Sequence, residues 1–255
     1  SQSRAIEDAL RKKNIEYTIY GGISFYQRKE IKDILSYLRI LINPNDEEAL
    51  KRIINYPARG IGATTIDRLT IAANHYKKSI FEIIKYLDKI DIKINSGTKN
   101  KLQNFMNMIL RLQIEAKTKN AFEIAEVVVK ETRLIKDLEK DETPESVSKV
   151  ENVQELLNGI KDFITDKIEE GEDCSLTTFL EDVALATDFD TKKNNDKPSV
   201  SLMTIHQSKG LEYLYVYIVG LEENLFPSAM SMNTRSELEE ERRLFYVALT
   251  RAEKV

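Results

Sequence analysis

The sequence has little of the chemistry that disulfides and metal sites need. Its 255 residues include one cysteine, Cys174, and two histidines, His75 and His206. A single cysteine excludes an internal disulfide and a cysteine-rich zinc site, and two isolated histidines disfavour a histidine-based metal site. We therefore expect no metal site in this chain, and we interpret His75 and Cys174 as structural residues.

Long hydrophobic runs are also missing. The apolar stretches are far too short to cross a bilayer, and nothing in the chain resembles a signal peptide. Apolar residues nevertheless make up 42% of the sequence, which is typical of a globular protein. We expect a soluble, cytoplasmic protein of one large or two ordinary domains, with no membrane partner.

A strongly basic character, which marks many nucleic-acid binders, is absent as well. The net charge is −4. The charges are unevenly distributed, because the first quarter of the chain is its basic part. A solvated helix surface explains this bias about as well as a binding surface does, so charge does not decide the function.

Helical patterning fills the middle of the chain. Apolar residues at helical spacing predict an amphipathic helix over Ile31–Ile42, and the pattern predicts only helices over Thr64–Thr187. Ser79 is placed to cap one of these helices, and Pro144 lies near the start of another. The polar run over residues 188–198 indicates a linker.

Strand signals occur only towards the two ends. Glu16–Tyr20 alternates as a strand does, and two glycines follow it. Val200–Ile205 and Leu214–Val219 are short apolar runs joined by a polar loop, and they predict two buried strands. Ser236–Glu239 predicts a capping box that starts a last helix. The pattern therefore favours one α/β domain interrupted by a helical insertion of about 170 residues.

Five stretches of the chain, in this order, resemble motifs of the UvrD/PcrA-type superfamily 1 DNA helicases. They are QSRAIEDAL, YGGISFYQRKEIKDILSYLR, PARGIG, TIHQSKGLEY and EEERRLFYVALTRAE. The resemblance implies an ATP-dependent translocase that moves 3′ to 5′ along single-stranded DNA and unwinds duplex DNA in repair or replication. The helical middle resembles the family in length and helicity only.

The resemblance also implies a division of the chain. Residues 1–22 and 198–255 would form a second RecA-like motor domain, truncated at its end, and residues 23–197 would form the helical insertion domain. None of the nine glycines lies in the G-x-x-x-x-G-K-[ST] context of a phosphate loop. We therefore expect a fragment that lacks the first RecA-like domain and is inactive without it. ATP with Mg²⁺ is the implied cofactor of the whole enzyme.

Two residues match the family's nucleotide contacts. Arg251 corresponds to the arginine that stabilises charge developing on the γ-phosphate, a task for which a guanidinium is suited. Glu212 corresponds to the carboxylate that accepts from a ribose hydroxyl. From the residues alone, Arg251 could instead compensate a helix dipole, and Glu212 could pair with Lys209.

Three residues of the polar loop are candidates for contact with single-stranded DNA. Thr204, His206 and Lys209 could donate hydrogen bonds to phosphates through a hydroxyl, an imidazole and an ammonium group. An isolated histidine is more often a satisfied structural residue, so that alternative stands beside the functional one.

A separate stretch is a candidate for contact with duplex DNA. Glycines just before a helix let a backbone approach a phosphate, which the exposed N–H groups and the helix dipole then hold without reading sequence. An ordinary tight turn is the alternative. The candidate donors are Arg59, Gly60, Gly62 and Thr64.

Two further groups have ordinary explanations as well. Phe25 and Tyr26, which lie near Arg28 and Lys32, could stack on unpaired bases, but core packing explains Phe25 at least as well. Arg242 or Arg243 could orient the surroundings of Arg251 or touch nucleotide, but an i, i+4 pair between Arg243 and Glu239 on the last helix is the favoured explanation.

Two rival functions remain at this point. One is the motor of a helicase–nuclease subunit, which a nuclease domain elsewhere in the protein would decide. The other is a non-catalytic module that binds DNA or docks a protein, such as a repair protein, through its helical insertion.

Overall fold

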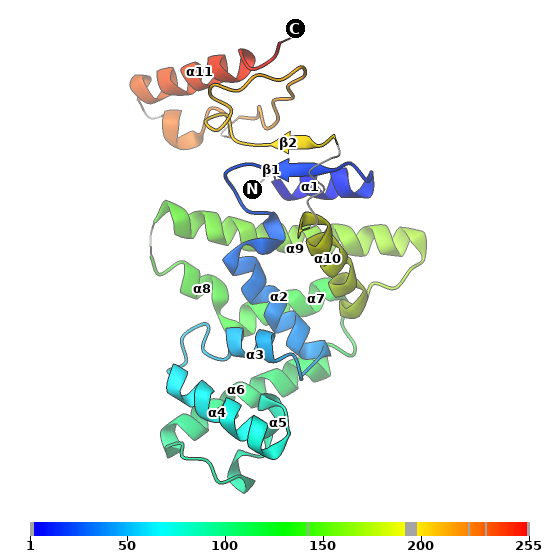
Figure 1. The fold of residues 1–255 in the computed structure, drawn as a ribbon, viewed down its shortest axis with the longest axis vertical. Coiled ribbons are helices and arrows are strands. Elements are labelled where there is room, and N and C mark those ends of the chain that lie inside the picture. The colour runs from blue at the N-terminus through cyan, green and yellow to red at the C-terminus, as the bar shows by residue number, and fades with distance from the viewer. Residues whose placement is uncertain (1–2, 142, 192–197, 224, 233, 254–255) are drawn as a thin grey trace. The chain divides into compact units, whose positions relative to one another are not determined.

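The computed structural model of the chain describes residues 3–141, 143–191, 198–223, 225–232 and 234–253 (Figure 1). This part is mostly helical and holds a two-stranded parallel sheet. The chain divides into two compact units, Tyr26–Asp188 and Gln2–Phe25 with Phe189–Val255. None of the described helices is long and apolar enough to span a bilayer.

The first unit is helical, as the pattern over Thr64–Thr187 predicts. It follows the short 3₁₀ turn η1 (Phe25–Gln27), and a second such turn is η2 (Leu87–Lys89). Its helices are α2 (Lys29–Ile42), α3 (Glu47–Ile53), α4 (Ala63–Tyr76), α5 (Ile80–Lys85), α6 (Ser96–Glu115), α7 (Ala121–Thr132), α8 (Leu134–Leu138), α9 (Pro144–Glu170) and α10 (Leu176–Thr191).

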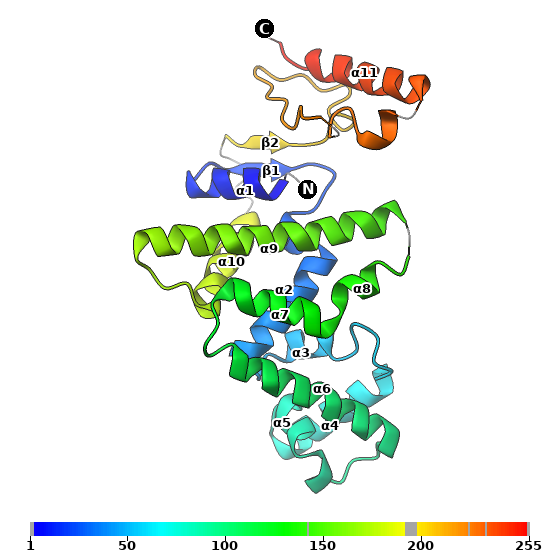
Figure 2. The ribbon, with the colours of Figure 1, turned by 180° about the vertical axis from the view of Figure 1, so that it is seen from behind.

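Helix α2 is the centre of this unit. It packs against α3, α6, α7 and α9, and Figures 1 and 2 show α9 running across it. Ile31, Ile34 and Leu38 are fully buried, as the helical spacing over Ile31–Ile42 predicts. Because α2 is surrounded by other helices, two of its carboxylates are buried as well, and each has a hydrogen-bond partner. Glu30 accepts from Asn152 (2.7 Å), and Asp33 accepts from Arg52 (2.6 Å).

Local sequence determines where several helices begin and end. Ser79 and Glu82 form a capping box at α5, with both reciprocal hydrogen bonds present. Pro144 is the first residue of α9, where its missing N–H is not needed. Gly171, at φ +70°, ends α9 in the left-handed conformation that glycine adopts without strain.

The second unit holds the sheet. Its elements are α1 (Ser3–Lys12), β1 (Tyr17–Ile19), β2 (Val200–Leu202), the 3₁₀ turn η3 (Ala229–Met232) and α11 (Arg235–Leu249). The two strands are parallel, with Tyr17 opposite Val200 and Ile19 opposite Leu202 (Figure 1). The strand predicted over Glu16–Tyr20 is therefore confirmed, and the one over Val200–Ile205 is confirmed for its first three residues.

The strand predicted over Leu214–Val219 is wrong for this structure. No strand is assigned there, and Tyr215, Tyr217 and Val219 are exposed by 73%, 89% and 60%. A strand needs a neighbour for its N–H and C=O groups, and within the described ranges only Tyr213 forms a bridge, with Ala252. Apolar alternation gives the propensity for a strand but does not supply the neighbour.

The start of α11 also differs from the prediction. The cap is Thr234, whose hydroxyl accepts from the Glu237 N–H (3.2 Å) and donates to the Glu237 carboxylate (2.7 Å). The predicted cap, Ser236, lies inside the first turn of α11. Both residues precede a glutamate by suitable distances, so the sequence pattern leaves the choice between them open.

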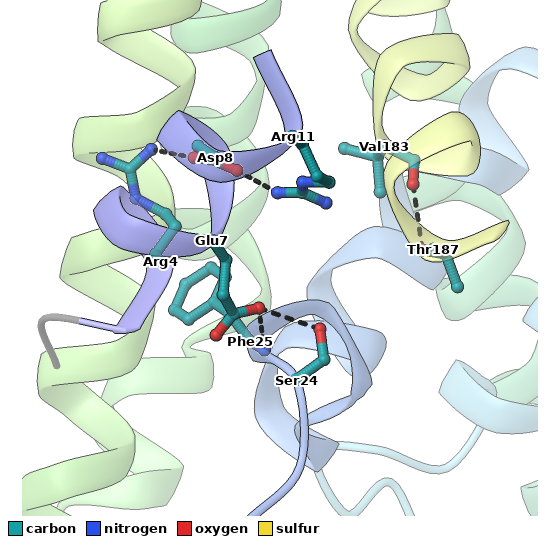
Figure 3. Close-up of polar contacts among 8 residues, drawn as sticks. All are labelled: Arg4, Glu7, Asp8, Arg11, Ser24, Phe25, Val183 and Thr187. Atoms are coloured by element: carbon teal, nitrogen blue, oxygen red, sulfur yellow. Dashed lines mark hydrogen bonds and ion pairs between the residues drawn. The ribbon is translucent and has the colours of Figure 1, made fainter. Parts of the chain in front are cut away.

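A buried carboxylate joins α1 to the segment after β1. Glu7 is fully buried, and its Oε2 accepts from the Ser24 hydroxyl (3.0 Å) and the Phe25 N–H (3.2 Å) (Figure 3). Arg4 and Arg11 both pair with Asp8 on the same helix. The buried residues of α1 are Arg4 and Glu7, so a charged group, and not an apolar face, joins this helix to the segment after β1.

A close contact joins the turn after β1 to the loop after β2. Gly21 has φ +64°, and a Cβ built on it would lie 1.9 Å from Nε2 of Gln207. Gln207 in turn accepts from the Thr204 N–H (3.0 Å). Any side chain at position 21 would therefore displace the side chain of Gln207, whose Oε1 accepts from the loop.

We predict that Gly21→Ala destabilises the α/β unit by about 2–3 kcal/mol, because it adds a clash to the left-handed strain of about 1 kcal/mol. Gly210→Ala is the matched control: Gly210 has φ +86° in the same unit, but a Cβ there meets nothing within 4 Å. Thermal unfolding followed by circular dichroism measures both variants.

In a double-mutant cycle, Gly21→Ala combined with Gln207→Ala should be less destabilising than the sum of the two single changes. Strict additivity, or equal losses for Gly21→Ala and Gly210→Ala, would show that the contact is unimportant.

Candidate functional site

The end of α11 positions Arg251. Its guanidinium is half-exposed and donates three local hydrogen bonds: to the Val247 carbonyl (3.0 Å), to the Leu211 carbonyl (2.9 Å) and to the Thr250 hydroxyl (3.0 Å). These bonds fix the side chain against the segment that contains Glu212.

A short backbone clasp reinforces this arrangement. The Tyr213 N–H donates to the Arg251 carbonyl, and the Glu253 N–H donates to the Tyr213 carbonyl, both at 2.9 Å. Tyr213 and Ala252 thereby form a parallel bridge. Two residues far apart in sequence, Glu212 and Arg251, are therefore brought together by main-chain pairing.

Glu212 presents its carboxylate to solvent. The residue is exposed, and the ion pairs of the described chain include none between Glu212 and Lys209. The pairing that the sequence left open for these two residues is therefore not seen. An exposed carboxylate beside an arginine can accept hydrogen bonds from a polyol such as a ribose.

The loop over residues 204–210 is a compact turn with exposed polar side chains. Its backbone is closed by mutual bonds between Thr204 and Gln207, and Ser208 donates through Oγ to the Ile205 carbonyl (2.8 Å). Thr204, His206 and Lys209 are exposed. The loop is thus held by its own hydrogen bonds, while the three candidate residues are exposed.

This loop lies at the carboxyl end of the parallel pair. The Tyr20 N–H donates to the Leu202 carbonyl (2.9 Å), and the chain then continues on one side into Gly21 and on the other into Met203. Parallel α/β sheets bind their ligands outside the carboxyl ends of the strands. The position of the loop therefore agrees with a binding role.

The four candidates for duplex contact lie in the turn over residues 59–62, which we call the glycine turn, and in the first turn of α4. Arg59 differs from the other three in its surroundings. Arg59 is bound by the protein: its guanidinium donates to the Tyr37 hydroxyl (2.6 Å) and the Ile53 carbonyl (2.9 Å), and it lies over the Phe105 ring. The turn itself is braced by Asn55, whose Oδ1 accepts from the N–H groups of Arg59 and Ile61.

Gly60, Gly62 and Thr64, by contrast, are exposed around the start of α4. Gly62 is the N-cap and offers no side-chain cap, so the first N–H groups of α4 lack the partner that a serine or aspartate would supply. Lys101 from α6 reaches the same turn, and its Nζ donates to the Gly60 carbonyl (3.3 Å).

Burial raises the pKa of the Tyr37 hydroxyl to about 12, although the nearby Arg59 opposes the shift. Tyr37 is fully buried and donates to the Tyr56 carbonyl, so the neutral phenol satisfies both neighbours. The ring and the guanidinium together connect the glycine turn to α2.

Other sequence candidates have structural roles. Phe25 and Tyr26 are buried, so core packing, not base stacking, describes them. Arg242 pairs with Glu239 (2.7 Å) and Arg243 with Glu240 (3.1 Å), each at i, i+3 and not in the expected i, i+4 arrangement. No group of three or more His, Cys, Asp or Glu side chains in the described ranges is placed to hold a metal ion.

Sequence reasoning missed several residues that shape these sites. Tyr37 looks like an ordinary core residue of an amphipathic helix, and Gln207 looks like a surface polar residue. Lys101 lies far from the glycine turn in sequence, so no local signal connects them. Only Gly21, within a Gly-Gly pair after a strand, carries a signal of close approach.

Comparison with known proteins shows the family of the chain. A model of the UvrD-like helicase C-terminal domain matches residues 1–255. The chain belongs to the UvrD-like helicase C-terminal domain family. The loop before Glu212 and the helix before Arg251 lie in the stretches that resemble that family's motifs.

Several relatives of this UvrD-like chain are named ATP-dependent DNA helicase PcrA. The protein of Bacillus subtilis (strain 168) is 39% identical over 258 residues, which is 99% of this chain and 34% of the relative. Those of Staphylococcus aureus (strain Mu50) and Staphylococcus epidermidis (strain RP62A) are 39% and 38% identical over 260 residues. The chain spans 34% of the length of each relative.

We predict that the stability of the UvrD-like helical unit falls as the pH rises from 10 to 12. An unfolded tyrosine ionises near pH 10, whereas folded Tyr37 keeps its proton to about pH 12, so ionisation favours the unfolded state within that window. Tyr37→Phe should reduce this fall but not abolish it, because burial also raises the pKa of Tyr56 to about 12. The variant should lower stability at pH 8, because Arg59 loses a partner.

The measurement is the melting temperature of both proteins at pH 8, 10 and 11.5. Tyr20→Phe, at an exposed tyrosine, is the control and should leave the pH slope unchanged. Identical slopes for Tyr37→Phe and the parent would contradict the assignment.

Proposed function

We propose that this chain is the second RecA-like motor domain, with its helical insertion domain, of an ATP-dependent DNA helicase that moves 3′ to 5′. The observation that carries the proposal is the adjacency of Glu212 and Arg251 beside a polar loop at the carboxyl end of a parallel strand pair. Residues 1–22 and 198–255 would belong to the motor, and residues 23–197 to the insertion.

In this proposal Arg251 and Glu212 form part of a nucleotide site whose remainder lies elsewhere in the protein. Bound ATP with Mg²⁺ would supply the phosphoanhydride whose cleavage drives movement. Arg251 offers a guanidinium to developing negative charge, and its bonds to the Val247 and Leu211 carbonyls limit the rotamers that it must give up. Glu212 accepts from a sugar hydroxyl. We assign no magnesium ligand to this chain.

The loop over residues 204–210 would hold single-stranded DNA. Thr204, His206 and Lys209 are exposed donors on a turn that is rigid at its base. Contacts of this kind hold phosphates without reading bases, as movement along any sequence requires. The loop is also continuous with Glu212, and five residues separate His206 from Glu212. A change at the nucleotide can therefore reach the DNA contact through the backbone.

Duplex DNA would meet the start of α4. Gly60, Gly62 and Thr64 would present backbone N–H groups and a hydroxyl to a phosphate, helped by the helix dipole. Arg59 is not assigned the DNA contact that the sequence suggests. Its guanidinium instead stabilises the turn by donating to the Tyr37 hydroxyl and the Ile53 carbonyl. Lys101, over Gly60, adds positive charge.

Two other functions compete with this one. A helicase–nuclease subunit would use the same motor geometry, and a nuclease domain in the complete protein would distinguish it. A non-catalytic module that binds DNA or a repair protein would not need Arg251 near Glu212, so the clasp between them favours the motor.

The first experiment replaces Arg251 in a complete protein that contains this chain. Arg251→Ala should lower kcat for DNA-stimulated ATP hydrolysis by about 10³-fold with little change in KM, because the guanidinium acts on the transition state. Arg251→Lys should not restore activity, since a point charge lacks the planar fork.

Arg243→Ala is the control for that experiment, because Arg243 is exposed and its ion pair among the described residues is with Glu240. It should retain near-parental ATPase activity. Retained hydrolysis in Arg251→Ala would sink the motor assignment and favour the binding module.

The second experiment uses the 255-residue chain and a labelled 20-base-pair duplex. Thr64→Glu should weaken binding about 10-fold at low salt, because it places a carboxylate where a phosphate would be held. Thr177→Glu is the matched control, because Thr177 is also the exposed second residue of a helix, α10. At that helix Ser175 Oγ already accepts from the Thr178 N–H (3.4 Å), so the helix start has a side-chain cap.

Fluorescence anisotropy across a salt series measures both variants. Equal affinities for Thr64→Glu and Thr177→Glu, or binding that does not change with salt, would exclude phosphate contact at α4.

A further inference from the structure

A hollow on the helical unit has no part in the function proposed above. It has a volume of about 880 Å³ and lies between α7, α8 and α9. We call it the α7–α8 hollow. Its floor is apolar, formed by Val127, Ile135 and Leu157, and its rim is mostly cationic.

Three of the rim cations have no ion partner within the described ranges: Lys130, Arg133 and Lys136 are all exposed, and none takes part in a described salt bridge. A fourth, Lys119, lies 4.0 Å from Glu115, the limit of an ion pair. The lining therefore has four cations and two carboxylates, an excess of positive charge.

The acidic groups nearby neutralise this charge only in part. Glu123 on the rim accepts from the Asn120 N–H in a capping box (3.0 Å). Just outside, Glu131 binds Arg111 and Asp137 binds Lys140. Glu126 is the one rim carboxylate for which the described residues show no partner. Cations that surround an apolar floor attract a ligand that is both acidic and apolar.

Arg133 also has an unusual backbone conformation. It ends α7 and precedes α8 at φ 57°, a left-handed conformation that suits glycine better than arginine. Lys77 has the same conformation at the end of α4, so a cation there also serves the helix dipole. What sets Arg133 apart is the hollow beside it.

We propose that the α7–α8 hollow is a docking site for an acidic segment of a protein partner, in which apolar side chains alternate with Asp or Glu. Its apolar residues occupy the floor over Val127, Ile135 and Leu157, and its carboxylates meet Lys130, Arg133 and Lys136. The floor argues for a peptide and against nucleic acid, because a phosphodiester backbone has no apolar group to bury there.

The test uses a fluorescein-labelled twelve-residue peptide in which Leu and Phe are separated by pairs of Glu and Asp. Anisotropy titration against the 255-residue chain should show binding that weakens with salt. The variant Lys130→Glu/Lys136→Glu should bind the peptide at least 10-fold more weakly.

Lys77→Glu/Lys85→Glu is the matched control, since it reverses the same charge at two exposed lysines of the same unit. It should bind like the parent, and circular dichroism should show both double variants to be folded. A hexaglutamate peptide should bind at least 10-fold more weakly than the probe, because it cannot use the floor.

Four results would overturn the proposal. The first is absence of peptide binding to the folded parent, the second is an equal loss of peptide affinity in the two double variants, and the third is equal affinity of the parent for hexaglutamate and the probe. The fourth is a loss in Lys130→Glu/Lys136→Glu of affinity for a 20-base-pair duplex but not for the peptide, which would make nucleic acid the occupant. Because Thr64 and Arg251 are unchanged, each result is distinguishable from failure of the proposed helicase function.

Discussion

The parallel pairing of β1 with β2 is the constraint on which the α/β unit depends. It joins Tyr17–Ile19 to Val200–Leu202 across an entire helical unit, a connection far longer than an ordinary crossover. Loop-closure entropy rises only slowly with length, so such an insertion is tolerable if the inserted chain folds by itself. The buried core around α2 meets that condition, since Ile31, Ile34 and Leu38 are fully buried within it.

Once the strands pair, their common direction determines where the candidate site residues lie. Parallel strands end at the same edge, so the turn at Gly21 and the loop over residues 204–210 meet there and fit through Gln207. The loop leads into Glu212, and the clasp between Tyr213 and Arg251 adds α11. The chain belongs to the UvrD-like helicase C-terminal domain family. In the proposed motor, the loop, Glu212 and Arg251 would act together.

The sequence predicted most of the helical architecture because helices are determined locally. Apolar spacing and caps such as Ser79 depend on residues within a few turns. Strand formation depends on a neighbour, which is why Leu214–Val219 misled the prediction. The role of Arg59 was unpredictable for a similar reason: its partners Tyr37 and Phe105 come from two other helices. Glu212 and Arg251 were found through motif resemblance, and main-chain pairing between Tyr213 and Ala252 brings them close together.

Gly62 has a consequence for the evolution and engineering of this fold. Nothing lies within 4 Å of a Cβ at that position, so a serine or aspartate would fit and would cap α4. Such a cap typically adds about 0.5–2 kcal/mol of stability relative to a residue that cannot cap, although less relative to glycine. It would also occupy N–H groups at the start of α4 that the proposed duplex contact uses. At this helix, a change that optimises thermal resistance would work against ligand affinity, so stability selection and functional selection would favour different residues.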